Sequence, residues 1–367
     1  MSQNKILYLS GLNGLRAIAS TSVVISHTLS PTYGDFGIKS NLRLPLAEFG
    51  VTLFFVISGF LITYLLLNEQ DLNDKINVKK FYFRRILRIW PIYYLSILLI
   101  SLLSIYIFKG ELEEFISVNL IWYILFAANI PFILSSGIKI ITHFWSIGVE
   151  EQFYLVWPLF IKYSNKNLNI KIIFLVTILI AIKLLVWQYI GKDSFIYRFI
   201  SVTRIHCMMV GAIGSILFYR KNLFYIDFFC NKWVQYVSWS LFVLIGAGFH
   251  VPAVVAHELF AIISLVIIIG QINFAKGIFC LETKLLNFLG KLSYGIYVYH
   301  PLVIFILAKY IRYIDINKEL KFVLIFSTVI VATILISYFS YEYYEKYFIQ
   351  LKTRLAVVKS TNEPQRC

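Results

Sequence analysis

The sequence contains little charge. Only 14% of its 367 residues are Asp, Glu, Lys or Arg, whereas a soluble globular domain has roughly 25%. Hydrophobic residues make up 59% of the chain, and the mean hydropathy is +0.76. This composition excludes an ordinary soluble domain. Long apolar runs recur from end to end, and they predict a polytopic helical membrane protein.

Several familiar chemical signatures are also missing. The cysteines show no Cys-x-x-Cys spacing, and the chain has neither a His-Glu-x-x-His motif nor a glycine-rich phosphate loop. We therefore expect no metal site and no bound cofactor. The net charge of +15 would suggest nucleic acid in a soluble protein. In a membrane protein the excess is better assigned to cytosolic loops, so no nucleic-acid partner is expected.

No targeting segment or linker is evident. The N-terminus lacks a basic segment followed by a small-residue cleavage site, so the first apolar segment is predicted to be a retained helix. No repeat of fixed period and no stretch rich in Pro, Gly or Ser divides the chain. We predict one membrane domain over residues 1–350 and a polar C-terminal tail over residues 351–367.

Eleven apolar segments are candidate membrane spans. They cover residues 12–30, 46–67, 89–108, 118–134, 144–162, 172–190, 199–219, 233–249, 256–274, 288–308 and 322–345. The segment 118–134 is short for a span of roughly 20 residues, and it contains Asn119, Asn129 and Pro131.

The distribution of Lys and Arg indicates whether segment 118–134 crosses the membrane, because cytosolic loops are enriched in basic residues. With the N-terminus inside and ten spans, 21 basic residues are cytosolic and 10 lie in outer loops. If the segment crosses, the split becomes 14 inside and 17 outside. We therefore predict an all-α bundle of about ten spans with cytosolic N- and C-termini. Residues 109–142 would form an outer loop with an interfacial or re-entrant piece.

The first span carries two polar side chains on one face. Arg16 and His27 are eleven residues apart, which is about three helical turns and about 16 Å along the axis. Alone, Arg16 could equally be an interfacial residue, and His27 would more often be an interhelix hydrogen-bonding residue. Polar side chains inside a bilayer are costly and usually have a partner. The pair on one face therefore favours a functional site.

Two adjacent carboxylates enter another apolar helix, in the stretch HFWSIGVEEQFYLVWP. Under the predicted topology, Glu150 lies about two turns below the outer surface, at a depth similar to that of His27. A carboxylate and an imidazole could therefore meet, which would orient the imidazole for general-base catalysis. The alternative is an interfacial cluster without a catalytic role.

Three arginines stand at the cytosolic mouth of the third predicted span, in FYFRRILRIWPIYYL. Arg85 and Arg88 are one turn apart, and Arg84 precedes them. For any single arginine, topology and anionic lipid headgroups are the simpler explanation. Together they match a clamp for a phosphorylated ligand, because guanidinium groups fit phosphate geometry.

Two further elements are weaker signals. Ser58 and Gly59, in FFVISGFLIT, predict a close approach between two helices. His300, which precedes Pro301, is more readily a helix-packing residue than a catalytic one.

Together these stretches resemble the membrane-bound acyltransferase family 3, the bacterial O-acyltransferases of surface sugars, antibiotics and signalling lipids. Four family motifs occur in order between residues 7 and 350. They correspond to Arg16 with His27; Arg85, Arg88 and Pro91; Trp145, Ser146 and Glu150 to Tyr154; and Phe288 to His300.

The resemblance implies an enzyme of the bacterial cytoplasmic (inner) membrane. Its co-substrate would be an acyl-CoA, usually acetyl-CoA, and its acceptor a hydroxyl of a saccharide or glycolipid. The implied catalytic residues are His27 and Glu150. The implied donor-binding residues are Arg16, Arg84, Arg85 and Arg88, and possible supporting residues are Ser146, Glu151, Tyr154 and His300.

Two alternatives stay open from the sequence. His27 would either take the acyl group covalently or deprotonate the acceptor hydroxyl.

Many relatives carry a fused extracytoplasmic esterase-like domain that this sequence does not contain, so we expect transfer within the membrane domain or with a separate partner. The rival class of function is a non-enzymatic transporter or flippase of a lipid-linked saccharide, which would not need a one-sided arginine clamp.

Overall fold

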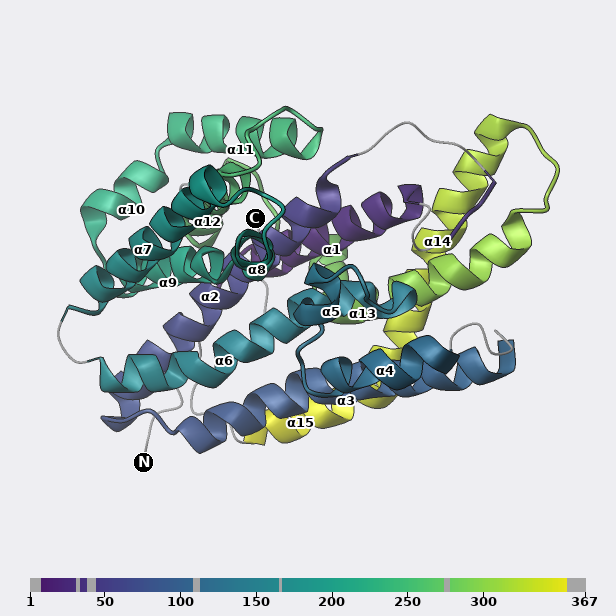
Figure 1. The fold of residues 1–367 in the computed structure, drawn as a ribbon. Coiled ribbons are helices and arrows are strands. Elements are labelled where there is room, and N and C mark those ends of the chain that lie inside the picture. Colours follow the sequence, from purple (N-terminus) through teal and green to yellow (C-terminus); the bar gives the residue numbers. More distant parts are fainter. Residues whose placement is uncertain are drawn as a thin grey trace.

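The computed structural model describes residues 8–30, 34–37, 44–107, 113–164, 167–273 and 278–354. Within these ranges the regular structure is entirely helical, as the all-α prediction requires (Figure 1). In chain order the helices are α1 (Leu12–Leu29), α2 (Leu46–Asn73), α3 (Val78–Ile107), α4 (Glu113–Ile124), α5 (Asn129–Ile133), the 3₁₀ helix η1 (Lys139–Phe144), α6 (Trp145–Tyr163), α7 (Leu168–Tyr189), α8 (Phe195–Thr203), α9 (Ile205–Tyr219), α10 (Leu223–Phe229), α11 (Lys232–Gly246), α12 (Ala256–Ile272), α13 (Lys284–Ile311), α14 (Lys318–Ser340), the π-helix η3 (Tyr341–Glu345) and α15 (Lys346–Arg354).

Six helical segments are long and apolar enough to cross a membrane. They are Leu46–Asn73, Val78–Leu103, Leu168–Tyr189, Phe195–Tyr219, Lys284–Ile311 and Lys318–Thr353. Helices α1, α6, α11 and α12 coincide with the other four of the ten predicted segments but fall short of that length or apolar character. The chain is therefore a multi-pass helical membrane protein. The count of ten spans and the sides of the termini stay predictions.

The segment 118–134 is a broken helix. Helix α4 ends at Ile124 and α5 begins at Asn129, with Phe126 between them in the left-handed region of backbone space (φ 55°). The α4 end is fixed to α3, because the hydroxyl groups of Tyr93 and Tyr94 donate to the carbonyls of Tyr123 and Ile124, each at 2.8 Å. Helix α4 has 12 residues and α5 has five, so neither can span a bilayer alone.

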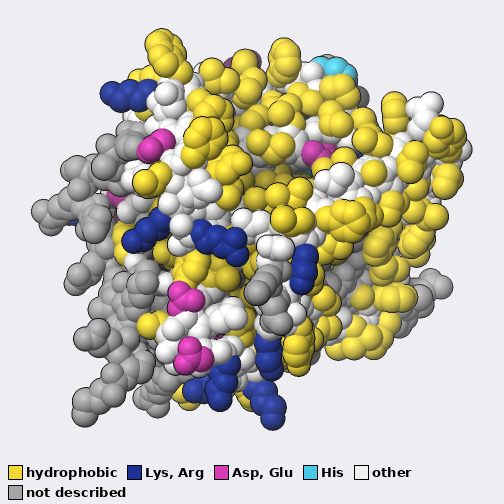
Figure 2. Space-filling model, turned by 90° about the vertical axis from the view of Figure 1, so that its left-hand side faces the viewer, with side chains coloured by type: hydrophobic (Ala, Val, Ile, Leu, Met, Phe, Trp, Pro, Cys, Tyr) yellow, Lys and Arg dark blue, Asp and Glu magenta, His cyan; other side chains and the backbone are white. Residues whose placement is uncertain are grey.

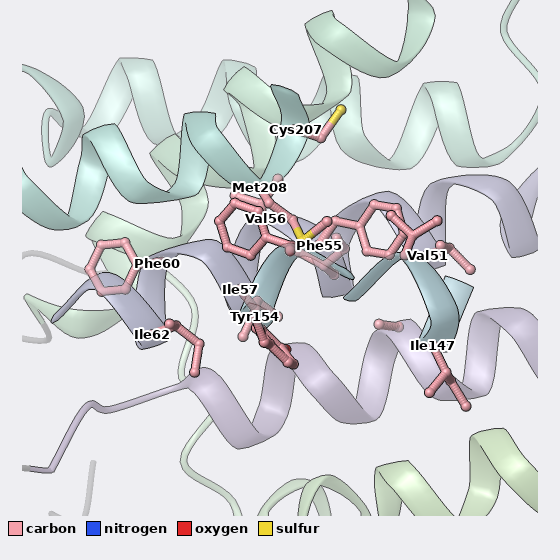
Figure 3. Close-up of a cluster of buried hydrophobic side chains, with 14 of the residues drawn as sticks. Val51, Phe55, Val56, Ile57, Phe60, Ile62, Ile147, Tyr154, Cys207 and Met208 are labelled. Atoms are coloured by element: carbon pink, nitrogen blue, oxygen red, sulfur yellow. The ribbon is translucent and has the colours of Figure 1, made fainter. Parts of the chain in front are cut away.

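Helices α2 and α9 cross with their backbones in contact. A Cβ atom added at Gly59 would lie 1.9 Å from the carbonyl oxygen of Met208, and one added at Gly211 would lie 2.1 Å from that of Val56. The close approach predicted at Gly59 is thus confirmed. Figure 3 shows Phe55, Val56 and Met208 packed around this crossing, with Tyr154 of α6 on the opposite side of α2. Direct backbone contact makes the crossing intolerant of any larger residue.

Helices α1 and α13 also approach closely near their N-terminal ends. A Cβ atom at Gly290 would lie 2.1 Å from the carbonyl oxygen of Asn13. The carboxylate of Glu282 accepts hydrogen bonds from the backbone N–H of Gly11 and from Nδ2 of Asn287. An anionic group at a helix N-terminus is stabilising. These contacts fix α1 beside α13, and the histidines of the two helices meet further along.

The last described helix returns along α3. The π-helix η3 joins α14 to α15, and α15 lies beside α3 (Figure 1). Because α15 extends to Arg354, the first four residues of the predicted polar tail are helical. Residues 355–367 lie outside the described ranges. The boundary predicted at residue 350 stays a prediction.

Candidate active site

Three histidines from separate helical elements meet in the bundle. Nδ1 of His27, in the last turn of α1, lies 2.8 Å from Nε2 of His300 in α13, and the two rings are stacked with centroids 5.0 Å apart. The ring of His143, in η1, turns its edge to His300 with centroids 5.2 Å apart. His143 and His300 are buried, whereas His27 is half-buried. His27 is therefore the histidine that a substrate can reach.

A hydrogen-bonded pair holds the histidine elements together. The hydroxyl oxygens of Ser146 and Tyr297 are 2.6 Å apart, and Tyr297 also donates to the backbone carbonyl of His143 at 2.9 Å. Ser146, predicted as a supporting residue, thus connects the start of α6 to α13. The same contacts fix η1, and with it His143, against His300.

Glu150 is held by side chains other than histidine. Ser58 donates to Oε1 of Glu150 at 2.8 Å, and Tyr154 donates to Oε2 at 3.3 Å. Glu150 is also close enough to Arg16 for an electrostatic interaction. Its hydrogen-bond partners among the described residues do not include His27, so the expected pairing of these two is not seen. The catalytic role of Glu150 stays a prediction.

Glu151, the neighbouring carboxylate, points to α3. Its Oε2 accepts a hydrogen bond from Nε1 of Trp90 at 3.0 Å. Adjacent residues on a helix are about 100° apart around the axis, which explains why Glu150 and Glu151 contact different helices. Glu151 therefore takes part in packing α6 against α3.

Four cations, here called the basic cluster, gather where α1, α3 and α15 meet. They are Arg16, Arg85, Arg88 and Lys352, and they interact electrostatically with one another. No described carboxylate lies within 4.0 Å of any of them. Like charges repel at short range, so this arrangement favours the binding of an anion.

Two arginines of the basic cluster have few partners among the described residues. Nε of Arg85 is buried without a hydrogen-bond partner, and its guanidinium lies over the rings of Phe81 and Tyr154 at 5.8 and 5.9 Å. Arg16 makes one long hydrogen bond, from Nη1 to Oδ1 of Asn13 at 3.5 Å. Buried guanidinium nitrogens normally have acceptors, so these groups are suited to an external ligand.

Arg84 differs from its neighbours in the same motif. Its Nη2 lies 2.6 Å from Oε2 of Glu69, and the other oxygen of Glu69 accepts from the backbone N–H of Asn77 at 3.0 Å. This ion pair fastens α2 to α3 beside their connecting turn. Figure 2 views the end of the bundle that holds this turn and shows Lys and Arg side chains gathered there. The guanidinium of Arg84 is thus engaged within the protein.

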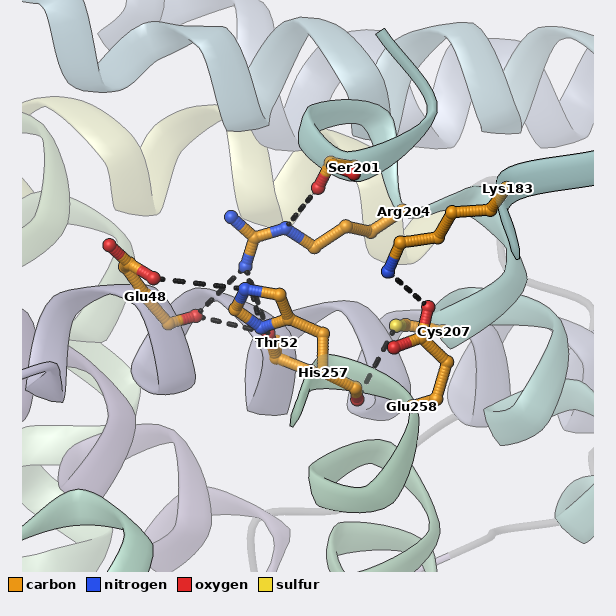
Figure 4. A network of polar contacts seen from close by, with 8 residues as sticks. All are labelled: Glu48, Thr52, Lys183, Ser201, Arg204, Cys207, His257 and Glu258. Atoms are coloured by element: carbon orange, nitrogen blue, oxygen red, sulfur yellow. Dashed lines mark hydrogen bonds and ion pairs between the residues drawn. The ribbon is translucent and has the colours of Figure 1, made fainter. Parts of the chain in front are cut away.

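A second network of charged groups lies between α2, α7, α9 and α12 (Figure 4). Lys183, whose side chain is 1% exposed, places its Nζ 2.7 Å from Oε1 of Glu258. Nε2 of His206 lies 2.8 Å from the same oxygen. Buried charges persist in a membrane bundle only when they are paired, so Glu258 neutralises Lys183.

Arg204 connects this network to the family motif on α6. Its Nη1 lies 3.1 Å from Oγ1 of Thr52 and 3.1 Å from Nδ1 of His257. Its guanidinium lies over the ring of Trp145 at 5.3 Å. Arg204 also has a left-handed backbone (φ 44°) at the junction of α8 and α9, a conformation that costs energy for a residue with a Cβ atom.

The sequence interpretation had not selected several of these residues. Lys183 and Arg204 are basic residues inside apolar runs of the sequence, and this is the available signal for the network around Glu258. His143 stands in the quoted α6 stretch but was not chosen. Lys352 falls in the predicted tail, and nothing in its local sequence connects it to the arginines of α1 and α3.

Comparisons with known proteins agree with the arrangement of the motifs. A sequence model of a family described as an acyltransferase domain matches residues 9–342. The O-acetyltransferase OatA of Staphylococcus aureus is 28% identical over 337 residues, which cover 83% of this chain and 52% of that protein. The peptidoglycan O-acetyltransferase OatA of Listeria monocytogenes is 28% identical over 321 residues, covering 80% and 49%. The chain thus spans about half the length of these relatives. No solved structure matches it.

Proposed function

Because the chain belongs to the membrane-bound acyltransferase family 3, we propose that it is an O-acyltransferase. It transfers an acyl group, most simply acetyl, from an acyl-CoA to a hydroxyl of a saccharide or glycolipid. The relatives named above are O-acetyltransferases, and the Listeria protein is named for peptidoglycan. These names favour an acetyl donor and a glycan acceptor of the cell envelope.

The observation that carries this proposal is the basic cluster. Arg16, Arg85, Arg88 and Lys352 offer four cationic groups with no carboxylate within 4.0 Å among the described residues. CoA carries a diphosphate and a 3′-phosphate, and guanidinium and ammonium groups bind phosphate oxygens strongly. Arg84 is already paired with Glu69 and fastens α2 to α3, so its role in donor binding stays a prediction.

The donor would bind at one side of the membrane and extend toward His27. Arg16 and His27 are eleven residues apart on α1, about 16 Å along the axis, which is comparable to an extended pantetheine arm. We propose that the phosphates bind at the cytosolic face of the bacterial inner membrane. The acceptor would then approach the half-buried His27 from the outer half, directly or through a separate extracytoplasmic partner.

The transfer can follow either of two routes at His27. As a general base, His27 takes the acceptor's hydroxyl proton while the oxygen attacks the thioester carbonyl. The C–S bond breaks, and the leaving thiolate receives that proton. In the covalent route, the imidazole nitrogen attacks first and CoA leaves; the acceptor oxygen then displaces the imidazole, and its proton goes to the thiolate. Both routes consume one acyl-CoA and one hydroxyl and release CoA and an ester.

Ten spans with both termini cytosolic complete this proposal. Cysteine replacing Lys139, an exposed residue in the 109–142 segment, should react with an impermeant thiol reagent added from outside. The reason is that the distribution of basic residues over all loops predicts an outer location for this segment. Cysteine replacing the exposed Lys80 should react only after the membrane is opened. The background protein has Cys280 and Cys367 replaced by serine. Labelling of position 139 from the cytosolic side alone contradicts the topology.

Neutralising the clamp should weaken donor binding. Each of Arg85→Ala and Arg88→Ala is expected to raise the KM for acetyl-CoA by about 10- to 150-fold, since one charge-assisted phosphate contact is worth about 1.5–3 kcal/mol. The measurement is steady-state transfer by purified protein with varied acetyl-CoA, together with direct binding of CoA.

The matched control is Lys80→Ala. Lys80 is an exposed cation on α3, near the same end of the bundle. Because Lys80 lies outside the basic cluster, the affinity of Lys80→Ala for CoA should stay within about twofold of wild type. If all three variants bind CoA like the wild type, these arginines serve topology or lipid contact instead.

A further inference from the structure

We propose that His300 is a positioning residue that holds His27 in one tautomer, with the proton on Nδ1 and the reactive lone pair on Nε2. The observation is the direct contact between Nδ1 of His27 and Nε2 of His300, at 2.8 Å. The inference rests on the proposed function, and it specifies which atom of His27 carries out either chemical route.

The direction of the hydrogen bonds starts at the backbone of α13. Nδ1 of His300 lies 3.1 Å from the carbonyl oxygen of Ile296, and the backbone of Tyr297 also interacts with this ring. A carbonyl oxygen can only accept a hydrogen bond, so Nδ1 of His300 must carry a proton. Pro301 contributes, because a proline has no N–H and leaves the carbonyl four residues earlier, that of Tyr297, without its helical donor.

The same reasoning then fixes His27. A neutral imidazole has one N–H and one lone pair, so Nε2 of His300 is an acceptor. Nδ1 of His27, which faces it, must therefore donate. The opposite arrangement would require a doubly protonated His300, and this side chain is fully buried, where a charged ring is costly. Since the proton of the neutral His27 ring is on Nδ1, its lone pair is on Nε2.

The surroundings keep the two rings in register. They are stacked with an interplanar angle of 26°, and the ring of His143 packs against His300 at an interplanar angle of 64°. The close approach between Gly290 and the backbone of Asn13 lets α1 and α13 pack tightly in this part of the bundle. A rotation of His27 would break the hydrogen bond and the stack together. The reactive nitrogen is thus preorganised, which is the condition for efficient proton transfer.

Two substitutions of nearly equal size separate hydrogen bonding from packing. In His300→Gln, the side-chain oxygen can accept the proton of His27 Nδ1 at the place of the lost ring nitrogen. His300→Met fills the same space but offers almost no acceptor. Loss of a tautomer-fixing partner lowers kcat by about 10⁴ in serine hydrolases, where that partner is a carboxylate. A neutral acceptor is weaker, so a smaller loss of about 10²-fold is expected here.

We expect His300→Gln to keep kcat within about tenfold of wild type and His300→Met to lose about 10²-fold. The KM for acetyl-CoA should be unchanged in both, because His300 does not touch the basic cluster. His250→Gln, at an exposed position, controls for loss of a histidine as such. Equal kcat values for the folded Gln and Met variants, high or low, overturn the proposal.

A direct measurement of the tautomer does not depend on turnover. Solid-state nitrogen NMR of protein with isotope-labelled histidine, with the His27 signals assigned by their loss in His27→Ala, reports which ring nitrogen bears the proton. We expect a proton on Nδ1 of His27 in the wild type and a mixture of tautomers in His300→Met. A protonated Nε2 at His27 in the wild type refutes the proposal. If acetyl transfer is absent but this tautomer is found, the proposed function fails and the positioning role stands.

Discussion

Replacing His27 by alanine should abolish acyl transfer while leaving a folded, inserted protein. One interhelix hydrogen bond in a membrane bundle contributes on average about 0.6 kcal/mol, which is too little to unfold the structure. Loss of a general base lowers the rate by about 10²–10⁴-fold, and loss of a covalent carrier lowers it further. The measurement is acetyl transfer from acetyl-CoA by purified protein, with size-exclusion elution and thermal unfolding as evidence of folding.

The same variant separates the two chemical routes. Wild-type protein incubated with radiolabelled acetyl-CoA and no acceptor should retain label if His27 is acylated, and His27→Ala should lose it. Wild-type protein that transfers acetyl groups without retaining label supports the general-base route. His250→Ala, which removes an exposed histidine, should behave like the wild type. Near-normal turnover by His27→Ala would make His27 a packing residue and remove the centre of the proposed mechanism.

The second large effect concerns Glu258. Glu258→Ala should lower the free energy of unfolding by about 3–5 kcal/mol, because it leaves a buried Lys183 without its counter-charge. The Lys183 side chain is 1% exposed, and its Nζ is 2.7 Å from the Glu258 carboxylate, so water cannot replace the lost partner. The measurement is thermal unfolding of the purified protein in detergent.

Two companion variants test the cause of that loss. Glu319→Ala removes an exposed carboxylate in the first turn of α14 and should unfold like the wild type. Lys183→Met combined with Glu258→Gln removes both charges, and it should recover most of the stability because no unpaired ion remains. If Glu258→Ala and Glu319→Ala unfold at the same temperature, the network around Glu258 contributes nothing measurable.

The helical architecture was accessible from the sequence because a bilayer enforces long apolar segments. Each of the ten predicted spans coincides with a helix, and the doubtful segment 118–134 is interrupted after Ile124. The small pair Ser58 and Gly59 was also informative, since small residues in an apolar helix indicate a close helix crossing. The partner of that crossing, Gly211 on α9, was not predictable because no local pattern relates two helices so distant in the chain.

The candidate site was predictable to the level of helix faces. Arg85 and Arg88 are three residues apart, so they share a face, and both belong to the basic cluster. Arg84 points about 100° away from Arg85 around α3, where it pairs with Glu69. The one-residue step from Arg84 to Arg85 therefore indicated different helix faces, although the motif by itself presents the three arginines as one group.

The direction in which a side chain points around a helix axis was not predictable from the sequence. Glu150 was expected to meet His27 because both were predicted at similar depth, yet its described partners are Ser58 and Tyr154. The neighbour of His27 is instead His300, from a helix almost three hundred residues later in the chain. Which face of each helix turns inward depends on the packing of all its neighbours, and a single sequence does not carry that information.

The return of α15 along α3 has a consequence for biosynthesis. The basic cluster combines Arg16 near the start of the chain, Arg85 and Arg88 of α3, and Lys352 of the last described helix. Ribosomes make the N-terminal helices first, and chains insert while they are being made. A nascent chain interrupted between α13 and α15 therefore contains His27 and His300 but lacks Lys352 of the basic cluster. In the proposed function, a complete clamp for acyl-CoA therefore forms only after α15 has been made.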